Sequence, residues 1–286
     1  MTPKKLSLAV QRPANRAVDK AGDVISLAWI DYTSEQYQHA YKTISDRRSF
    51  HTYPLNTFQA NLRQRIAKLW LSKNEYFISQ RLKRIVSIIA KLKRYPTSKL
   101  ARMQDIWWIR AVLPNMDSLT LLKESYIKQK PSKLYTLIRT KDYIANPKDS
   151  WYRSIHLIFE YHKSQAAGLH FEFQIRTLIQ HARATAVETI GTFIWSSLKS
   201  NQWPDAWLEY FKYVSVWFSY LEWTKINGNF LDQSPKEVVR QIKERGTRLD
   251  VEQKIQWFSA VIKHIDNSIK PQSWTEPFFL IVLRTK

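Results

Sequence analysis

The segment His170-Phe-Glu-Phe-Gln-Ile-Arg-Thr177 alternates apolar and polar side chains. Successive side chains of a β-strand point to opposite faces, so the alternation predicts a strand with one apolar and one polar face. The polar face would carry Glu172, Gln174 and Arg176. The opposite face, which carries Phe171, Phe173 and Ile175, would pack into a core.

The residues before this segment predict a second strand, over Tyr152–Tyr161, which joins the first through Lys163–Gly168 as a hairpin. Alternation along it puts Tyr152, Ser154 and His156 on one face. Two neighbouring strands with polar side chains on one side could form the floor of a binding site. A half-solvated sheet face fits the pattern equally well.

Three more segments favour extended structure. Asp105–Leu113 is apolar and stops at Pro114-Asn115, Lys133–Ile144 ends near Asn146-Pro147, and Phe278–Leu283 is a short apolar run near the end of the chain. Asp105 and Glu172 supply one carboxylate from each of two strands. Such a pair is the smallest set that could hold a hard divalent cation on phosphates.

A strongly basic stretch precedes Asp105. Eight Lys or Arg residues and no acidic residue lie between Ser79 and Gln104. Apolar residues at helical spacing build one face, Ile85, Ile88, Ile89 and Leu92, and basic residues fall on the opposite arc, Lys83, Arg84, Lys91 and Arg94. Tyr95-Pro96 would end the helix. Its basic face is either a solvated surface or a site for polyphosphate or a nucleic-acid backbone.

The remaining pattern is mostly helical. Helices are predicted at 34–48, 56–72, 117–128, 178–199, 203–225, 235–246 and 250–266, with a turn at His51–Pro54 and no clear period in the first 24 residues. This order predicts an α+β fold, a mixed β-sheet flanked by helices. We expect an N-terminal helical extension (1–75), a central domain (76–225), and C-terminal helices with a final strand that pack on it (226–286).

Composition excludes several classes of protein. The 286 residues include no cysteine, which excludes a disulfide scaffold and a thiol nucleophile. No apolar run approaches the length of a membrane-spanning helix, and we expect no membrane partner and a cytoplasmic location. Five glycines and no GxGxxG or GxxxxGK[ST] argue against glycine-rich phosphate loops. The net charge of +21 points to a polyanionic partner.

Five motifs carry a resemblance to a known family. In order along the chain they are Arg81–Arg94, Arg102–Ile106, Asp142–Lys148, Tyr152–His156 and Glu172–Thr177. Their sequence and spacing are similar to the RelA/SpoT synthetase domain. The resemblance extends to about residue 225 and is to a stand-alone subgroup, because the chain has no His-Asp dipeptide of the family's hydrolase domain.

The resemblance implies a fold similar to nucleotidyltransferases and transfer of the β,γ-diphosphate of ATP to a ribose 3′-hydroxyl, usually of GDP or GTP. It implies that the ATP phosphates are held by Arg81, Lys83, Lys91 and Arg94. Arg110 would stack on adenine, as a planar guanidinium can. Asp105 and Glu172 would bind Mg²⁺, and Glu172 would also accept the proton of the attacking hydroxyl.

On the acceptor side, the resemblance implies that Tyr152 stacks on the base. Lys148 and His156 would lie near the acceptor phosphates, and Gln174 and Arg176 would complete this site. His156 has a second interpretation, as a structural hydrogen-bonding residue.

Three residues depart from the family pattern. Trp108 and Trp151 stand where glycine is usual, and Arg183 where an aromatic residue is common. Trp108 either fills space near the nucleotide or packs in the core. Arg110 lies an odd number of residues from Asp105, so a bulge or strand end must redirect it. Aromatic residues at helical spacing in the C-terminal third are expected in the core, Trp195, Trp203, Trp207, Trp217 and Phe218.

Three functions remain open from the sequence. The first is synthesis of guanosine tetra- or pentaphosphate from ATP. The second is a toxin that pyrophosphorylates the 3′ CCA end of tRNA, which the net charge would suit. The third is a degenerate nucleotide-binding module. An antitoxin partner or a homo-oligomer is compatible with either active form.

Overall fold

A computed structural model describes residues 11–256 except 28, 131 and 198–204. The chain forms two compact units, and each is described by itself. The first comprises residues 1–111, 120–141 and 156–175, and the second 112–119, 142–155 and 176–286. The predicted strand at Phe278–Leu283 lies outside the described residues, as does most of the predicted helix 250–266, of which residues 251–256 are helical.

A five-stranded sheet organises the first unit. Its strands are β1 (Phe77–Leu82), β2 (Trp107–Leu113), β3 (Tyr135–Asp142), β4 (Ile155–Tyr161) and β5 (Leu169–Thr177), in the order β1-β2-β5-β4-β3. The predicted mixed sheet flanked by helices is therefore confirmed. So is the pairing of the two hairpin strands, and η2 (Ser164–Ala166) lies in their connection. Strand β4 begins only at Ile155, so Tyr152 and Ser154 precede the strand that contains His156.

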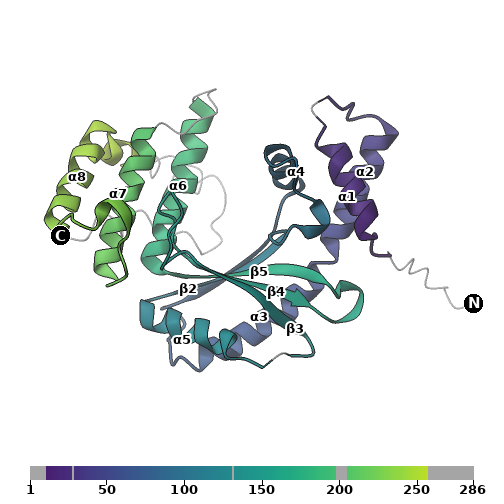
Figure 1. The fold of residues 1–286 in the computed structure, drawn as a ribbon, viewed down its shortest axis with the longest axis horizontal. Helices are drawn as coiled ribbons and strands as arrows, with labels where there is room; N and C mark the ends of the chain where they lie inside the picture. The colour runs from purple at the N-terminus through teal and green to yellow at the C-terminus, as the bar shows by residue number, and fades with distance from the viewer. Residues whose placement is uncertain (1–10, 28, 131, 198–204, 257–286) are drawn as a thin grey trace, which may run out of the picture. The chain divides into compact units, whose positions relative to one another are not determined.

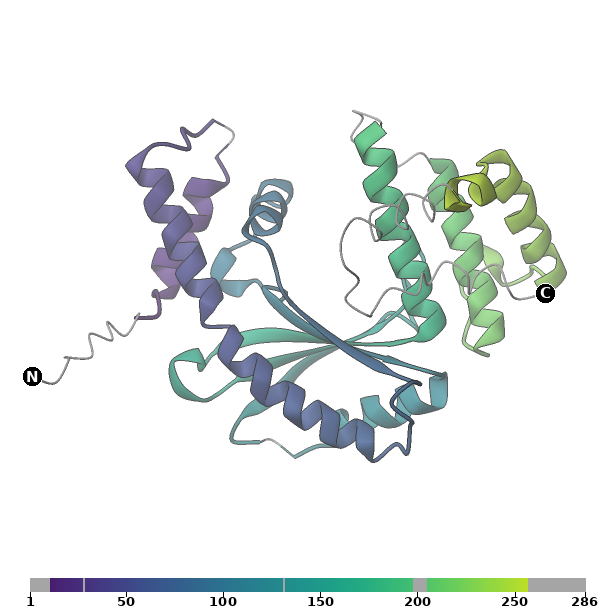
Figure 2. The ribbon, with the colours of Figure 1, turned by 180° about the vertical axis from the view of Figure 1, so that it is seen from behind.

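Aromatic packing fixes one face of the sheet. Helices α3 (Thr52–Ala67) and α5 (Met116–Ile127) lie along this face (Figures 1 and 2). Phe58 of α3 is fully buried, and its ring centroid is 4.8 Å from Phe171 and 5.4 Å from Phe173 of β5. The alternation of β5 is thus realised as predicted, because the side chains between these two phenylalanines point to the other face.

Three helices form a second core in the first unit: α1 (Asn15–Ile25), α2 (Glu35–Ser49) and α4 (Ile85–Arg94), with η1 (Leu100–Arg102). Helix α1 was not predicted, although Val18 and Ile25 lie on one buried face. A Cβ at Gly22 would come within 3.0 Å of Leu100, so glycine allows α1 to approach η1 closely. The predicted turn at His51–Pro54 is instead the start of α3, whose first turn accepts proline.

The basic stretch folds differently from its prediction. Arg81 lies in strand β1, and Lys83 and Arg84, which the prediction placed on the basic arc of the helix, precede α4. The Lys83 N–H donates to the Ile106 carbonyl at 2.8 Å, which prolongs the contact between the chain segments of β1 and β2. Arg84 is extended, with ψ 144°. Of the basic residues in this stretch, only Lys91, Lys93 and Arg94 therefore belong to helix α4.

The second unit is helical. It contains α6 (Leu178–Ser197), α7 (Asp205–Leu221), η3 (Gly228–Phe230) and α8 (Pro235–Arg248), and α7 contacts both α6 and α8. Trp207, Trp217 and Phe218 pack in its apolar clusters, as predicted for core aromatics. Within the described residues, no helix is both long and apolar enough to span a membrane.

Candidate functional site

Three charged side chains meet beside strands β1 and β2. Lys83 follows β1, Asp105 precedes β2, and Lys91 lies on α4. Lys83 Nζ is 2.7 Å from Asp105 Oδ2, and Lys91 Nζ is 2.7 Å from Asp105 Oδ1. One carboxylate thus binds two ammonium groups, each with a different oxygen. The cluster keeps one net positive charge, which favours an anion close by.

The pKa of Asp105 reflects this environment. Burial alone would raise it, but the hydrogen bonds and charges of Lys83 and Lys91 outweigh burial and lower it from the ordinary value of 3.8. Asp105 is therefore an ionised carboxylate at neutral pH. The two lysines hold it in place through its oxygens.

A second carboxylate, Glu172, lies on the central strand β5. His156 Nδ1, on the neighbouring strand β4, is 3.2 Å from Glu172 Oε1, and Gln174 Nε2 donates to the same oxygen. On the other side, Arg110 Nε of β2 donates to Gln174 Oε1 at 3.0 Å. The structure therefore brings four predicted site residues from three strands into one hydrogen-bonded network.

Glu172 is 9% exposed. Burial would raise its pKa, but interactions with His156 and a hydrogen bond from Gln174 lower it below the ordinary 4.5. The charge of Asp105 acts on Glu172 in the opposite direction. The charge of Asp105 thus reaches Glu172, and both carboxylates stay ionised at neutral pH.

Trp108 and Arg110 share one face of β2. The Arg110 guanidinium carbon lies 4.5 Å from the centroid of the Trp108 ring. Trp108 is half-buried, whereas its neighbour Trp107 is fully buried in the aromatic core. Trp108 thus supports Arg110 rather than packing in the core. Because Asp105 precedes β2, strand alternation does not relate it to Arg110, and a strand end redirects the two side chains as expected.

Two predicted phosphate ligands stand outside this network. Arg81 of β1 and Arg94 at the end of α4 are exposed. Neither makes an ion pair within the described part of the chain. They are arranged on elements next to the Asp105 cluster, since β1 leads directly to Lys83 and α4 carries Lys91.

The predicted acceptor residues of the second unit gather around Tyr152. Arg176 Nη2 donates to the Tyr152 hydroxyl, and its guanidinium carbon lies 4.9 Å from the ring centroid. Lys148 Nζ is 5.1 Å from the same ring, and Tyr143 meets it edge-on at 5.8 Å. The phenol ring is therefore surrounded by cationic groups.

A cavity of about 210 Å³ opens beside this ring. The 142–155 loop contributes Lys148, Ser150 and Tyr152, and α6 contributes Arg183 and Glu188. Arg183 is buried, and desolvation lowers its pKa to about 10. Its Nη2 donates to the Ser150 carbonyl.

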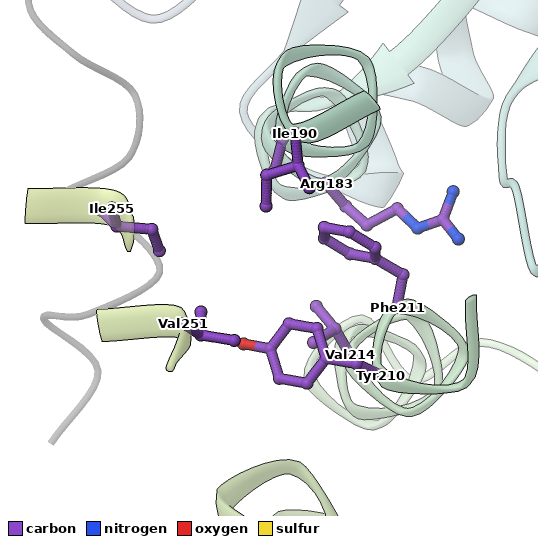
Figure 3. Close-up of a pocket in the computed structure, with 8 residues that line it drawn as sticks. Arg183, Ile190, Tyr210, Phe211, Val214, Val251 and Ile255 are labelled. Atoms are coloured by element: carbon purple, nitrogen blue, oxygen red, sulfur yellow. The ribbon is translucent and has the colours of Figure 1, made fainter. Parts of the chain in front are cut away.

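A smaller cavity of about 30 Å³ lies behind Arg183, lined by apolar side chains of α6, α7 and residues 251–255 (Figure 3). The Arg183 guanidinium is directed away from these side chains. The Arg183 guanidinium therefore belongs to the wall of the larger cavity. The sequence marks Arg183 as a departure from the family pattern, and this departure is the signal that could have assigned it to the site.

Part of the chain that carries this site is similar to known proteins. Residues 80–190 match the region found in RelA / SpoT proteins. A stretch of 120 residues, 40% of this chain, is 34% identical to GTP pyrophosphokinase YjbM of Bacillus subtilis (strain 168). The chain covers 56% of that relative's length.

Solved structures show the same fold. Small alarmone synthetase 1 of Bacillus subtilis is similar with a TM-score of 0.51 at 24% identity, over 61% of this chain and 89% of that one. Small alarmone synthetase 2 of the same organism gives a TM-score of 0.50 at 21% identity, over 62% and 94%. Both carboxylates and both lysines described above lie within residues 80–190, the segment that matches the region found in RelA / SpoT proteins.

Proposed function

We propose that the chain is an ATP-dependent diphosphotransferase that makes guanosine tetra- or pentaphosphate from GDP or GTP. One observation supports this above all: two ionised carboxylates, Asp105 and Glu172, interact next to the ammonium groups of Lys83 and Lys91. Such a site can neutralise a transferring polyphosphate and accept a hydroxyl proton. The relative named a GTP pyrophosphokinase supports the same reaction class.

In the proposed step, the ribose 3′-oxygen of the acceptor attacks the β-phosphorus of ATP. The bond between that phosphorus and the oxygen bridging it to the α-phosphate breaks, and AMP leaves with the bond's electron pair. The 3′-hydroxyl proton passes to Glu172. Because the pKa of Glu172 is lowered, its carboxylate is ready to accept a hydrogen bond from this hydroxyl at neutral pH.

The residues fit a magnesium ion. Asp105 and Glu172 offer hard oxygen ligands, which Mg²⁺ prefers, and Mg²⁺ usually takes its other ligands from water and phosphate. This suits a pair of carboxylates, which would leave the remaining positions to water and phosphate. Among the described residues, no group of three or more His, Cys, Asp or Glu side chains could hold a metal ion. When bound, the ion would neutralise charge on the transferring phosphates.

The cationic residues divide by task in this proposal. Lys83 and Lys91 hold Asp105 and balance phosphate charge, and Arg81 and Arg94 supply further positive charge from the neighbouring strand and helix. Arg110 stacks on adenine while Trp108 supports its guanidinium from the side. These five cationic residues all serve ATP.

The acceptor base stacks on Tyr152, and Lys148 and Arg176 balance the acceptor phosphates. His156 and Gln174 act through Glu172, since both hydrogen-bond to its carboxylate. They therefore orient the group that receives the proton.

The test is incubation of the protein with ATP labelled at the γ-phosphate and Mg²⁺, with GDP, GTP or deacylated tRNA supplied in turn. We expect label in a guanosine tetra- or pentaphosphate. Glu172→Gln should lower the rate by about 100-fold or more, in the range of a lost general base. Glu160→Gln on the adjacent strand β4 is the matched control and should keep most activity.

Label found only on the tRNA 3′ end would replace the proposed acceptor with RNA. Absence of transfer to every acceptor, in an assay where a known synthetase is active, would overturn the reaction itself. Equal rates for wild type and Glu172→Gln would remove Glu172 from the chemistry.

A further inference from the structure

Residues Ser150–Ser154 of the loop that carries Tyr152 are held one after another by elements of the second unit. The Ser150 carbonyl accepts from Arg183 of α6, and the Trp151 carbonyl accepts from Ser215 Oγ of α7 at 2.5 Å. Arg176 reaches both the Tyr152 hydroxyl and Ser154 Oγ, the latter at 3.4 Å.

Arg153 attaches the loop to the segment that follows α7. It is 3% exposed, and its guanidinium donates to Thr224 Oγ1 and to the Lys225 carbonyl, the latter at 2.6 Å. A further bond joins Asn227 Nδ2 to the Ala145 carbonyl at 2.8 Å. The segment that follows α7 is therefore bonded to the loop at two points.

Trp151 is the unusual member of the loop. Its φ is +56°, a left-handed conformation that glycine adopts without cost and that residues with a Cβ adopt less readily. Its ring meets Phe230 of η3 edge-on, at 4.9 Å between centroids and 82° between planes. Phe230 itself is buried against α7 and α8, with Tyr213, Val216 and Val238.

We propose that α7, η3 and the segment 224–227 form a scaffold for acceptor binding, and that Trp151 is the positioning residue that fastens the loop to it. Trp151 occupies a glycine-like backbone conformation while its half-buried side chain packs against an apolar cluster. The side chain thereby fixes the shape of a loop that a glycine would leave free to move. Figures 1 and 2 show α7 and α8 side by side in this unit.

The scaffold lies outside residues 80–190, so it is a feature that the matched region does not contain. The inference rests on the proposed function only for the identity of what Tyr152 binds. The attachment of the loop can be measured without activity. Two readouts are therefore needed, hydrogen exchange of residues 142–155 and the KM values of the two substrates.

The central variants are Trp151→Gly and Trp151→Phe. Trp151→Gly suits the backbone conformation but removes the contact with Phe230. We expect faster exchange over 142–155 and a KM for the guanosine nucleotide raised about three- to tenfold, the worth of an aromatic pair, with an unchanged KM for ATP. Trp151→Phe keeps an aromatic ring, so its hydrogen exchange over 142–155 and its KM for the guanosine nucleotide should stay close to the wild-type values.

Phe230→Ala tests the same contact from the scaffold, and Val251→Ala, in the other apolar cluster of the unit, controls for a general loss of stability. Phe230→Ala should match Trp151→Gly, and the double variant should be no worse than either single one. Unchanged exchange in both single variants, or a KM for ATP that rises as much as the acceptor KM, would overturn the proposal. If wild type transfers no label, the proposed function fails, and the exchange data still decide whether the scaffold holds the loop.

Discussion

Asp105 carries the charge balance of the lysine cluster, and its ionisation makes the cluster sensitive to pH. In the folded protein its pKa is below the ordinary 3.8. Because the pKa is lower in the folded protein, the ionised Asp105 stabilises the fold in full at every pH above the pKa that it has in the unfolded chain. This contribution is lost as the pH falls through the lower, folded value.

Asp105→Asn should therefore destabilise the protein at neutral pH, because it leaves Lys83 and Lys91 close together without a carboxylate. The difference in Tm from wild type should stay constant from about pH 7 to about pH 5 and shrink below about pH 4, where wild type also becomes neutral at this position. Thermal unfolding across this range measures it. Asp46→Asn, at an exposed helical pair, serves as control, and a difference that persists undiminished in acid would contradict the assignment.

Trp108 decides how Arg110 is presented. Its ring is 4.5 Å from the guanidinium carbon, so Trp108→Ala removes a supporting surface. We expect the KM for ATP to rise about two- to fivefold, the range of an exposed cation–π contact, while the KM for the acceptor stays constant. Trp70→Ala, at a fully exposed tryptophan, is the control. Tighter ATP binding by Trp108→Ala would instead mean that the indole occupies space that adenine needs.

At the scale of elements, alternation in β5 could be predicted because one face packs on aromatic rings and the other holds polar groups. The effect of the Asp105 charge on Glu172 could not be predicted from the sequence, because it depends on β2 lying next to β5, which is a long-range pairing. The periodicity around Ile88 predicted α4 but overextended it, because the backbone of Lys83 bonds to Ile106 instead of entering the helix. Helix α1 was not predicted, although Val18, Ala21, Gly22 and Ile25 recur at helical spacing on one buried face and could have indicated it.

Helix α4 holds Lys91 through its buried side. Ile88 is fully buried in the second core of the first unit, whereas Val86, two residues away, is 68% exposed. Ile88→Ala should cost about 2–5 kcal/mol of unfolding free energy, the range for a buried isoleucine, and Val86→Ala about 0.5 kcal/mol or less. Urea titrations of both variants test this. Similar losses for the two would mean that the face of α4 is assigned wrongly.

At the scale of the whole molecule, some cationic side chains have specific partners, but the net charge remains strongly positive. Lys83 and Lys91 bind a carboxylate, and Arg153 and Arg183 are buried against carbonyl oxygens. Other cations make exposed pairs, such as Arg240 with Glu237 and Glu244. Exposed pairs of this kind contribute about 0–1 kcal/mol each. Because each pair is neutral, the whole net charge of +21 remains as a source of mutual repulsion.

This repulsion should make the protein more stable as salt is added. The distance over which charges interact falls from about 30 Å at 0.01 M to about 10 Å at 0.1 M ionic strength, so repulsion across the molecule is screened before close pairs are. We expect Tm to rise over this interval of NaCl concentration. A variant with the exposed Lys68, Lys73 and Lys93 changed to Gln should start from a higher Tm and show a smaller rise, because less repulsion remains to be screened. A Tm that falls with salt in both proteins would mean that attractive ion pairs outweigh the net charge.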